Sequence, residues 1–111
     1  MLSEIDNKDP DVDIILPNYN NGKYLKETIN SIIAQTYENW KLFIIDDNSQ
    51  DNSKEIIGNY KNEKNNIVYL SKNKGVAFCR NLAIRLSNSK YIAFLDSDDY
   101  WSQNKLKEQI L

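Results

Sequence analysis

The sequence predicts an α/β fold with a largely parallel, Rossmann-like sheet whose strands alternate with helices. Two observations support this prediction. Short apolar runs of strand length recur along the chain, and each is followed by polar residues and then by apolar residues at helical spacing. Strands that alternate with helices in this way form parallel sheets with right-handed crossovers.

The first half of the chain is expected to hold two strands and two helices. Residues 12–16 form an apolar strand, which Pro17 is expected to end because proline cannot donate a hydrogen bond to a sheet. Apolar residues at helical spacing predict a helix over 23–35, and an apolar run predicts a second strand over 40–45. Asn52 and the glutamate three positions later have the spacing of a capping box at the start of a short helix.

The second half is also expected to hold two strands and two helices. A strand over 67–70 precedes an amphipathic helix over 76–86. Residues 91–95 contain tyrosine, isoleucine and phenylalanine in a short apolar run and indicate a buried strand. Ser102 is the expected N-cap of a last helix, which continues to the final residue.

No internal repeat, linker or low-complexity tract divides the chain. Residues 1–11 are polar and are expected to form a flexible leader. Residues 12–111 are expected to form one segment, truncated at its C-terminus because the last helix reaches the final residue.

Composition narrows the classes of function. The 111 residues are 41% hydrophobic and 27% charged, as in a soluble globular domain. A net charge of −2 argues against nucleic acid as a partner. The absence of histidine excludes a histidine-based triad and disfavours zinc. The single Cys79 cannot form an internal disulfide, and no apolar run reaches the roughly 20 residues that cross a bilayer, so we expect a cytoplasmic protein.

Three polar loops carry the candidate site. They follow the first, second and fourth predicted strands, and in a parallel sheet they meet at one edge, where ligands bind. The side chains that would converge there are Tyr19, Asp46, Asp47, Arg80 and the carboxylates of Asp96-Ser97-Asp98-Asp99.

The acidic cluster at 96–99 indicates a cation or ligand site. Three carboxylates within four residues repel one another, and a hard divalent metal with oxygen ligands would neutralise them. The other residues also have purely structural interpretations. Asp46 and Asp47 suit turns or helix caps, and Tyr19 suits packing. Arg80 suits a solvated helix face, and the thiol of Cys79 suits the core.

Five motifs lie in order along residues 12–111. They are IILPNYN at 14–20, SIIAQTY at 31–37, IIDDNSQDNS at 44–53, NKGVAFCRN at 73–81 and YIAFLDSDDYW at 91–101. In this order and spacing they resemble the N-terminal, nucleotide-sugar-binding half of the family 2 glycosyltransferases, which have the GT-A fold. Two positions depart from the family pattern: Asn48 replaces a glycine, although asparagine also tolerates left-handed backbone, and Cys79 replaces an alanine.

The resemblance implies roles for individual residues. Pro17 and Tyr19 would border the nucleotide base, and Asp47 would hydrogen-bond that base, which is expected to be uracil. Arg80 would lie near the base or the diphosphate. The remaining implied roles belong to the D-x-D motif: Asp98 would coordinate Mg²⁺ or Mn²⁺, and Asp96 would contact the ribose, the sugar or metal-bound water.

The resemblance also implies an activity. The full-length enzyme would be an inverting transferase that moves a sugar from a UDP-sugar donor to a hydroxyl of a saccharide or lipid-linked acceptor. The implied catalytic base lies beyond residue 111, so the chain alone is expected to be inactive. Peripheral association with the inner face of the membrane is also expected, as is a homo-oligomer, because losing the second half would expose a sheet edge.

Other classes of function fit the sequence less well. A signalling receiver domain would have its acidic pair after the first strand, whereas here that pair follows the second. A nucleotidyltransferase would have a glycine- and lysine-rich loop after the first strand, where this chain has Pro17-Asn18-Tyr19-Asn20. A non-catalytic nucleotide-binding or assembly domain stays open, and an assembly domain would show no metal-dependent nucleotide binding.

Overall fold

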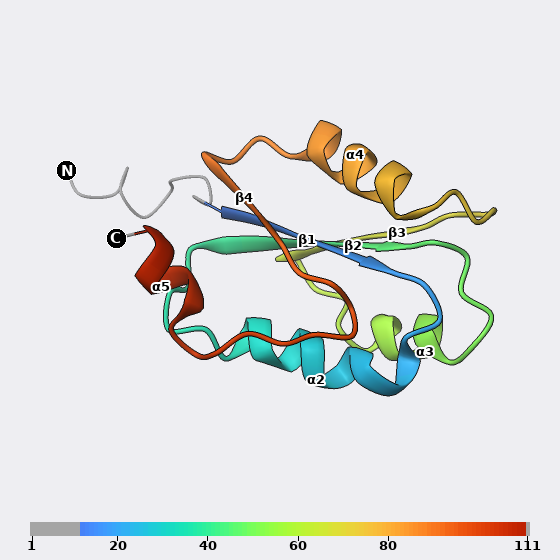
Figure 1. Cartoon of the computed structure of the whole chain (residues 1–111), viewed down its shortest axis with the longest axis horizontal. Coiled ribbons are helices and arrows are strands. Elements are labelled where there is room, and N and C mark those ends of the chain that lie inside the picture. The colour runs from blue at the N-terminus through green and yellow to red at the C-terminus, as the bar shows by residue number, and fades with distance from the viewer. Residues whose placement is uncertain (1–11, 111) are drawn as a thin grey trace.

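The computed structural model describes residues 12–110 of the chain, so the predicted leader at 1–11 lies outside the described residues (Figure 1). Strands alternate with helices throughout, as predicted. The elements are β1 (Val12–Asn18), α2 (Gly22–Ile33), β2 (Trp40–Asp46), α3 (Ser53–Gly58), β3 (Asn65–Tyr69), α4 (Val76–Leu86), β4 (Tyr91–Phe94) and α5 (Lys105–Ile110). Within residues 12–110, no helix has the length and apolar character needed to cross a bilayer.

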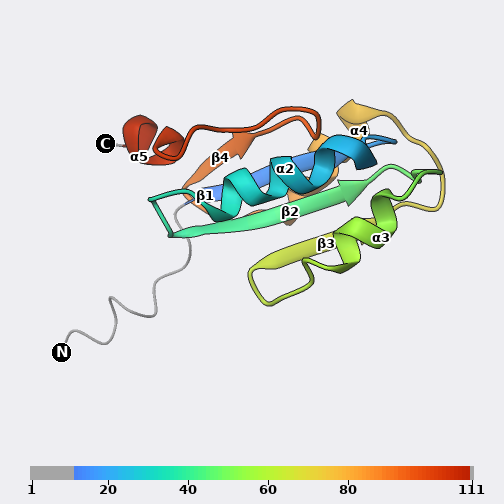
Figure 2. The same cartoon turned by 90° about the horizontal axis from the view of Figure 1, so that it is seen from below.

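The four strands form one sheet in the order β3-β2-β1-β4, and every pair is parallel. The predicted fold class is therefore confirmed. Helices α2 and α3 cover one face of the sheet, and α4 covers the other (Figures 1 and 2). Because the strands are parallel, the loops after β1, β2 and β4 leave the sheet at the same edge.

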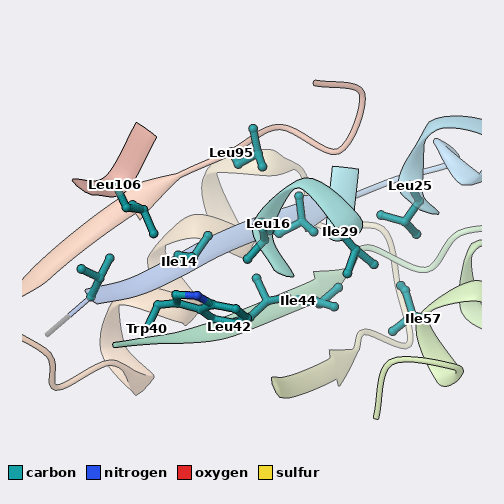
Figure 3. Packing of buried hydrophobic residues seen from close by; sticks show 12 residues of the cluster. Ile14, Leu16, Leu25, Ile29, Trp40, Leu42, Ile44, Ile57, Leu95 and Leu106 are labelled. Carbon is teal, nitrogen blue, oxygen red and sulfur yellow. The ribbon is translucent and has the colours of Figure 1, made fainter. Parts of the chain in front are cut away.

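Hydrophobic side chains fill both faces of the sheet. Alternate residues of a strand point to opposite faces, so Ile14 packs toward α2 and Ile15 toward α4. Figure 3 shows the larger cluster, in which Leu42 and Ile44 of β2 meet Ile29 of α2. Each of these side chains is fully buried, which stabilises the fold by about 1.5–3 kcal/mol per side chain. Cys79 belongs to the smaller cluster, as predicted.

Strand β1 continues through Pro17 to Asn18, so the prediction that Pro17 ends the strand is wrong. The ladder with β2 runs on to Asn18, whose carbonyl accepts the N–H of Asp47 at 2.8 Å. Alternate residues of β1 bond to opposite neighbours, and Ile15 accepts from Leu95 on the β4 side at 3.0 Å. Pro17 faces that same side, beyond the last paired residue of β4, where no backbone donor is needed.

Strand β4 was expected to be buried, and this expectation is wrong for most of its residues. Tyr91, Ile92 and Phe94 are 44%, 39% and 47% exposed, because β4 is an edge strand with only β1 beside it. Leu95, directly after the strand, is the residue that enters the core. The order of strands therefore decides the burial of β4.

The ends of several elements also differ from expectation: α2, for example, ends at Ile33, two residues before the expected end. Asn52 lies at the N-cap position of α3, as expected from its spacing. Asn52 makes no capping hydrogen bond with its side chain. The carboxylate of Asp51 bonds to the start of α3 instead, where it accepts the N–H of Ser53 at 2.9 Å. The same carboxylate accepts the N–H of Gly22, at the start of α2, at 2.9 Å. Strand β3 begins at Asn65, two residues before the expected start. Helix α5 begins three residues after Ser102, so Ser102 is not its N-cap.

Candidate functional site

A cavity of about 340 Å³ opens at the carboxyl edge of the sheet. It is lined by the loops after β1, β2 and β4 and by the start of α4, as the parallel topology requires. All six residues predicted for the site lie around this one cavity: Pro17, Tyr19, Asp47, Arg80, Asp96 and Asp98.

The first two loops are joined through Asp46, which is fully buried. Its carboxylate accepts hydrogen bonds from the Asn18 amide at 2.9 Å and from the Ser49 hydroxyl at 2.7 Å. Asn48, which lies between Asp46 and Ser49 in the sequence, has a φ of 60°. This left-handed backbone conformation is one that asparagine was expected to tolerate. Asp46 is thus a structural residue that fixes the shape of both loops.

Asp47, its neighbour, points to the loop before α4 instead. One carboxylate oxygen accepts the N–H of Lys74 at 2.7 Å, and the other accepts the N–H of Gly75 at 2.9 Å. Gly75 has a φ of 92°, a left-handed conformation that glycine adopts without strain. Asp47 is 4% exposed, and its carboxylate offers about four acceptor sites, more than its neighbours fill, so it can accept from a further donor. The carboxylate therefore holds the start of α4 and faces the cavity.

Cys79 also borders this cavity, although the residue is fully buried. Burial raises the pKa of the Cys79 thiol to about 11, and the negative charges of Asp47 and Asp46, together with a hydrogen bond between the thiol and the Asp47 carboxylate, add to the effect. A thiol with this pKa is protonated at neutral pH and is a poor nucleophile. Cys79 therefore acts as a small apolar lining residue.

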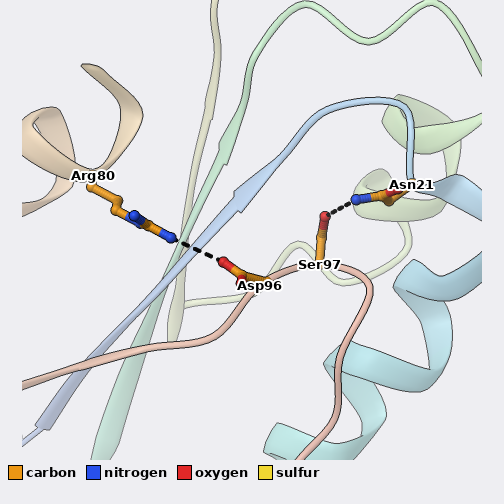
Figure 4. Close-up of polar contacts among 4 residues, drawn as sticks. All are labelled: Asn21, Arg80, Asp96 and Ser97. Atoms are coloured by element: carbon orange, nitrogen blue, oxygen red, sulfur yellow. Dashed lines mark hydrogen bonds and ion pairs between the residues drawn. The ribbon is translucent and has the colours of Figure 1, made fainter. Parts of the chain in front are cut away.

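Arg80 reaches across the cavity to the acidic loop. Its Nη2 lies 3.1 Å from Oδ1 of Asp96 (Figure 4). Its guanidinium carbon lies 5.8 Å from the ring centre of Phe94. The two charged side chains are 40% and 61% exposed, so this ion pair adds little stability. Because the ion pair is weak, Arg80 and Asp96 can each leave it to bind a ligand.

The carboxylates of the acidic loop diverge. Asp99 accepts the N–H of Tyr100 at 2.8 Å and does not line the main cavity, whereas Asp98 lines it and is exposed. Within residues 12–110, no three acidic, cysteine or histidine side chains gather into a metal cluster. Mg²⁺ is often held by one or two carboxylates together with phosphate oxygens, and an exposed carboxylate such as that of Asp98 fits this use.

Besides Cys79, four lining residues were not predicted as site residues: Asn18, Asn21, Val76 and Ser97. Asn21 donates from its amide to the Ser97 hydroxyl at 2.9 Å and so joins the first loop to the acidic loop (Figure 4). The signal for these residues was positional. Each lies in, or directly beside, one of the loops that the topology brings to this edge.

Comparison with known proteins agrees with this arrangement. The model of the family described as "Glycosyl transferase family 2" matches residues 13–111. The glycosyltransferase TuaG of Bacillus subtilis (strain 168) is 39% identical over 103 residues, which cover 91% of this chain and 41% of TuaG. The UDP-Glc:alpha-D-GlcNAc-diphosphoundecaprenol beta-1,3-glucosyltransferase WfgD of Escherichia coli is 39% identical over 99 residues, which cover 89% of this chain and 39% of WfgD.

Among solved structures, residues 1–349 of S. aureus TarS superpose with a TM-score of 0.83 at 30% identity. The match covers 89% of this chain and 31% of the TarS chain. The same TarS region has been solved in complex with UDP-GlcNAc and matches with a TM-score of 0.81. The chain thus spans well under half the length of each of these relatives.

Proposed function

The chain belongs to glycosyl transferase family 2, and from this premise we propose that its carboxyl-edge cavity binds the nucleotide of a UDP-sugar donor. The observation that carries the proposal is the cavity itself, which brings an aromatic ring, a buried carboxylate, a guanidinium and an exposed carboxylate together. The TarS complex with UDP-GlcNAc supports the choice of donor. In the full-length enzyme the sugar would pass to an acceptor hydroxyl.

The base would occupy the part of the cavity between the first two loops. Tyr19 is 45% exposed at its rim, so its ring is available to stack on a base, with Pro17 beside it. Asp47 accepts hydrogen bonds only, and uracil offers an N–H donor where cytosine has an acceptor. The lone pairs that Lys74 and Gly75 leave on the Asp47 carboxylate would therefore favour uracil.

The diphosphate would lie between Arg80 and Asp98. Arg80 would exchange its contact with Asp96 for phosphate oxygens, for which the guanidinium has well-matched geometry. Asp98 and Asp96 would hold Mg²⁺ or Mn²⁺, which supplies a Lewis acid for the negative charge that develops on the leaving diphosphate. Asp96 would also contact the ribose or sugar once Arg80 has moved.

The remaining parts of the reaction belong to the full-length protein. We propose that this chain binds donor without transferring sugar, since no catalytic base is assigned within it, and that the complete enzyme inverts the anomeric centre. A saccharide or lipid-linked acceptor agrees with the diphosphoundecaprenol substrate in the name of WfgD. Such an acceptor would bring the enzyme to the cytoplasmic face of a membrane.

The exposed edge of β4 is the surface through which we propose that the chain self-associates.

Calorimetric titration of the chain with UDP, with and without Mn²⁺, tests the proposed site. Asp98→Ala is expected to reduce the gain in affinity from Mn²⁺ about tenfold, because one of few carboxylate ligands is lost. Glu63→Ala removes an equal charge from an exposed turn and is the matched control. CDP is expected to bind more weakly than UDP. The proposal would be refuted if the affinity for UDP were the same with and without Mn²⁺ and in Asp98→Ala, and if CDP bound as tightly as UDP.

A further inference from the structure

A row of polar side chains on α2 supports the acidic loop. The chain leaves β4, passes the carboxyl edge and then runs back beside α2 toward α5 (Figures 1 and 2). Thr28 and Ser31 of α2 and Gln35, just beyond its end, are spaced i, i+3 and i+7, so they lie on one face. Each of the three bonds to the backbone of residues 97–106.

Thr28 contacts the acidic loop directly. Its hydroxyl has one proton to donate and lies 3.2 Å from the carbonyl oxygen of Tyr24, one turn earlier in α2. The same hydroxyl lies 3.0 Å from the carbonyl oxygen of Ser97 and within hydrogen-bond distance of that of Asp99. These two carbonyls flank Asp98, the proposed metal ligand, on either side. Thr28 is 1% exposed and does not line the cavity, so it reaches the loop from behind.

Ser31 and Gln35 hold the segment that follows. The Ser31 hydroxyl accepts the N–H of Trp101 at 3.1 Å. The buried Gln35 amide donates to the carbonyl of Ser102 at 2.7 Å and accepts the N–H of Leu106 at 3.1 Å. All these bonds go to main-chain atoms, so they fix the path of the loop and leave the carboxylates free to face the ligand.

We propose that Thr28 is a positioning residue for the metal and diphosphate site, with Ser31 and Gln35 extending its hold on the same segment. The single hydroxyl proton of Thr28 bonds to the carbonyl of Ser97 or of Asp99, on one side of Asp98 or the other. The backbone held in this way places the carboxylate of Asp98 against the proposed metal-bound diphosphate. Thr28 touches neither the nucleotide nor the metal. This inference rests on the proposed function, because it assigns a role within the same site.

The test compares Thr28→Val, which keeps the shape of threonine and loses its hydroxyl, with Thr28→Ser, which keeps the hydroxyl. The readout is the ratio of the UDP dissociation constants without and with Mn²⁺, measured by calorimetry on the whole chain. Loss of one buried hydrogen bond predicts a ratio about fivefold smaller for Thr28→Val. Metal-free UDP affinity is expected to stay unchanged, and Thr28→Ser is expected to restore the ratio.

Thr36→Val is the matched control. It removes the same hydroxyl from an exposed threonine that bonds to Asn104 at 2.7 Å, away from the acidic loop, and it should leave the ratio unchanged. If a thermal melt shows that Thr28→Val does not fold, Ser31→Ala takes its place and is expected to lower the ratio in the same direction.

The outcomes separate the two proposals. If Thr28→Val keeps the wild-type ratio, the positioning role is overturned and the proposed site is unaffected. The same conclusion follows if Thr28→Val loses affinity for UDP equally with and without Mn²⁺, because that is what a merely structural residue would produce. A wild-type chain whose UDP binding does not respond to Mn²⁺ overturns both proposals.

Discussion

The hydrogen bonds of Asp47 predict how far its replacement by asparagine lowers the free energy of unfolding. The Asp47 carboxylate, 4% exposed, accepts two backbone N–H groups at 2.7 and 2.9 Å. In Asp47→Asn one oxygen becomes an NH₂ group that faces an N–H donor, so one charge-assisted bond is lost and the other becomes a neutral one. We expect the free energy of unfolding to fall by about 3 kcal/mol, from roughly 2 for the lost bond and 1 for the weakened one.

Urea unfolding of the metal-free and nucleotide-free chain measures this change. Asp98→Asn is the matched control, because the side chain of Asp98 is exposed and makes no hydrogen bond within residues 12–110. The unfolding free energy of this variant should stay within about 0.5 kcal/mol of wild type. Hydrogen exchange adds a local readout, since the amides of Lys74 and Gly75 should lose protection in Asp47→Asn. An unfolding free energy equal to wild type, with both amides still protected, would show that Asp47 does not hold this loop.

Two further predictions concern titratable groups. Burial raises the pKa of Asp51, but hydrogen bonds from Ser53 and from the backbone of Gly22 outweigh it, so the pKa of this carboxyl lies below its usual value. The ionised Asp51 carboxylate therefore stabilises the folded chain fully at pH values above its unfolded pKa of about 3.9. This stabilisation is lost as the pH falls through the lower pKa that Asp51 has in the folded chain. Asp51→Asn should be less stable than wild type at pH 6 in thermal melts and equal to it in strong acid; a constant difference across this range would contradict the assignment. The pKa of Cys79 is raised to about 11 and its side chain is fully buried, so iodoacetamide at pH 8 should label it only after unfolding in urea. Rapid labelling of the folded chain, followed by mass spectrometry, would show that the thiol is accessible.

Local sequence determined much of the fold. Alternating strand and helix patterns are local properties of the chain, and they imply a parallel sheet whose loops share an edge. That inference was enough to bring Tyr19, Asp47 and Asp98 to one cavity. The apolar spacing around Cys79 likewise predicted its burial, because helical periodicity defines the face that meets the sheet.

Tertiary structure alone decided which strand lies at the edge of the sheet. An apolar run has the same sequence signature whether one or two strands flank it, so the exposure of β4 depends on the strand order β3-β2-β1-β4. The same order allows Pro17 to remain inside β1, because β4 stops before reaching it. Neither result follows from local propensity.

Hydrogen-bond partners far apart in sequence were also beyond local prediction. Asp46 and Asp47 are adjacent, yet one joins the first two loops and the other holds the start of α4, because their side chains leave the backbone in different directions. Thr28 meets residues about 70 positions later only when the chain turns back beside α2. The sequence by itself thus determined which loops form the site, whereas the packed chain decided what each polar side chain in them holds.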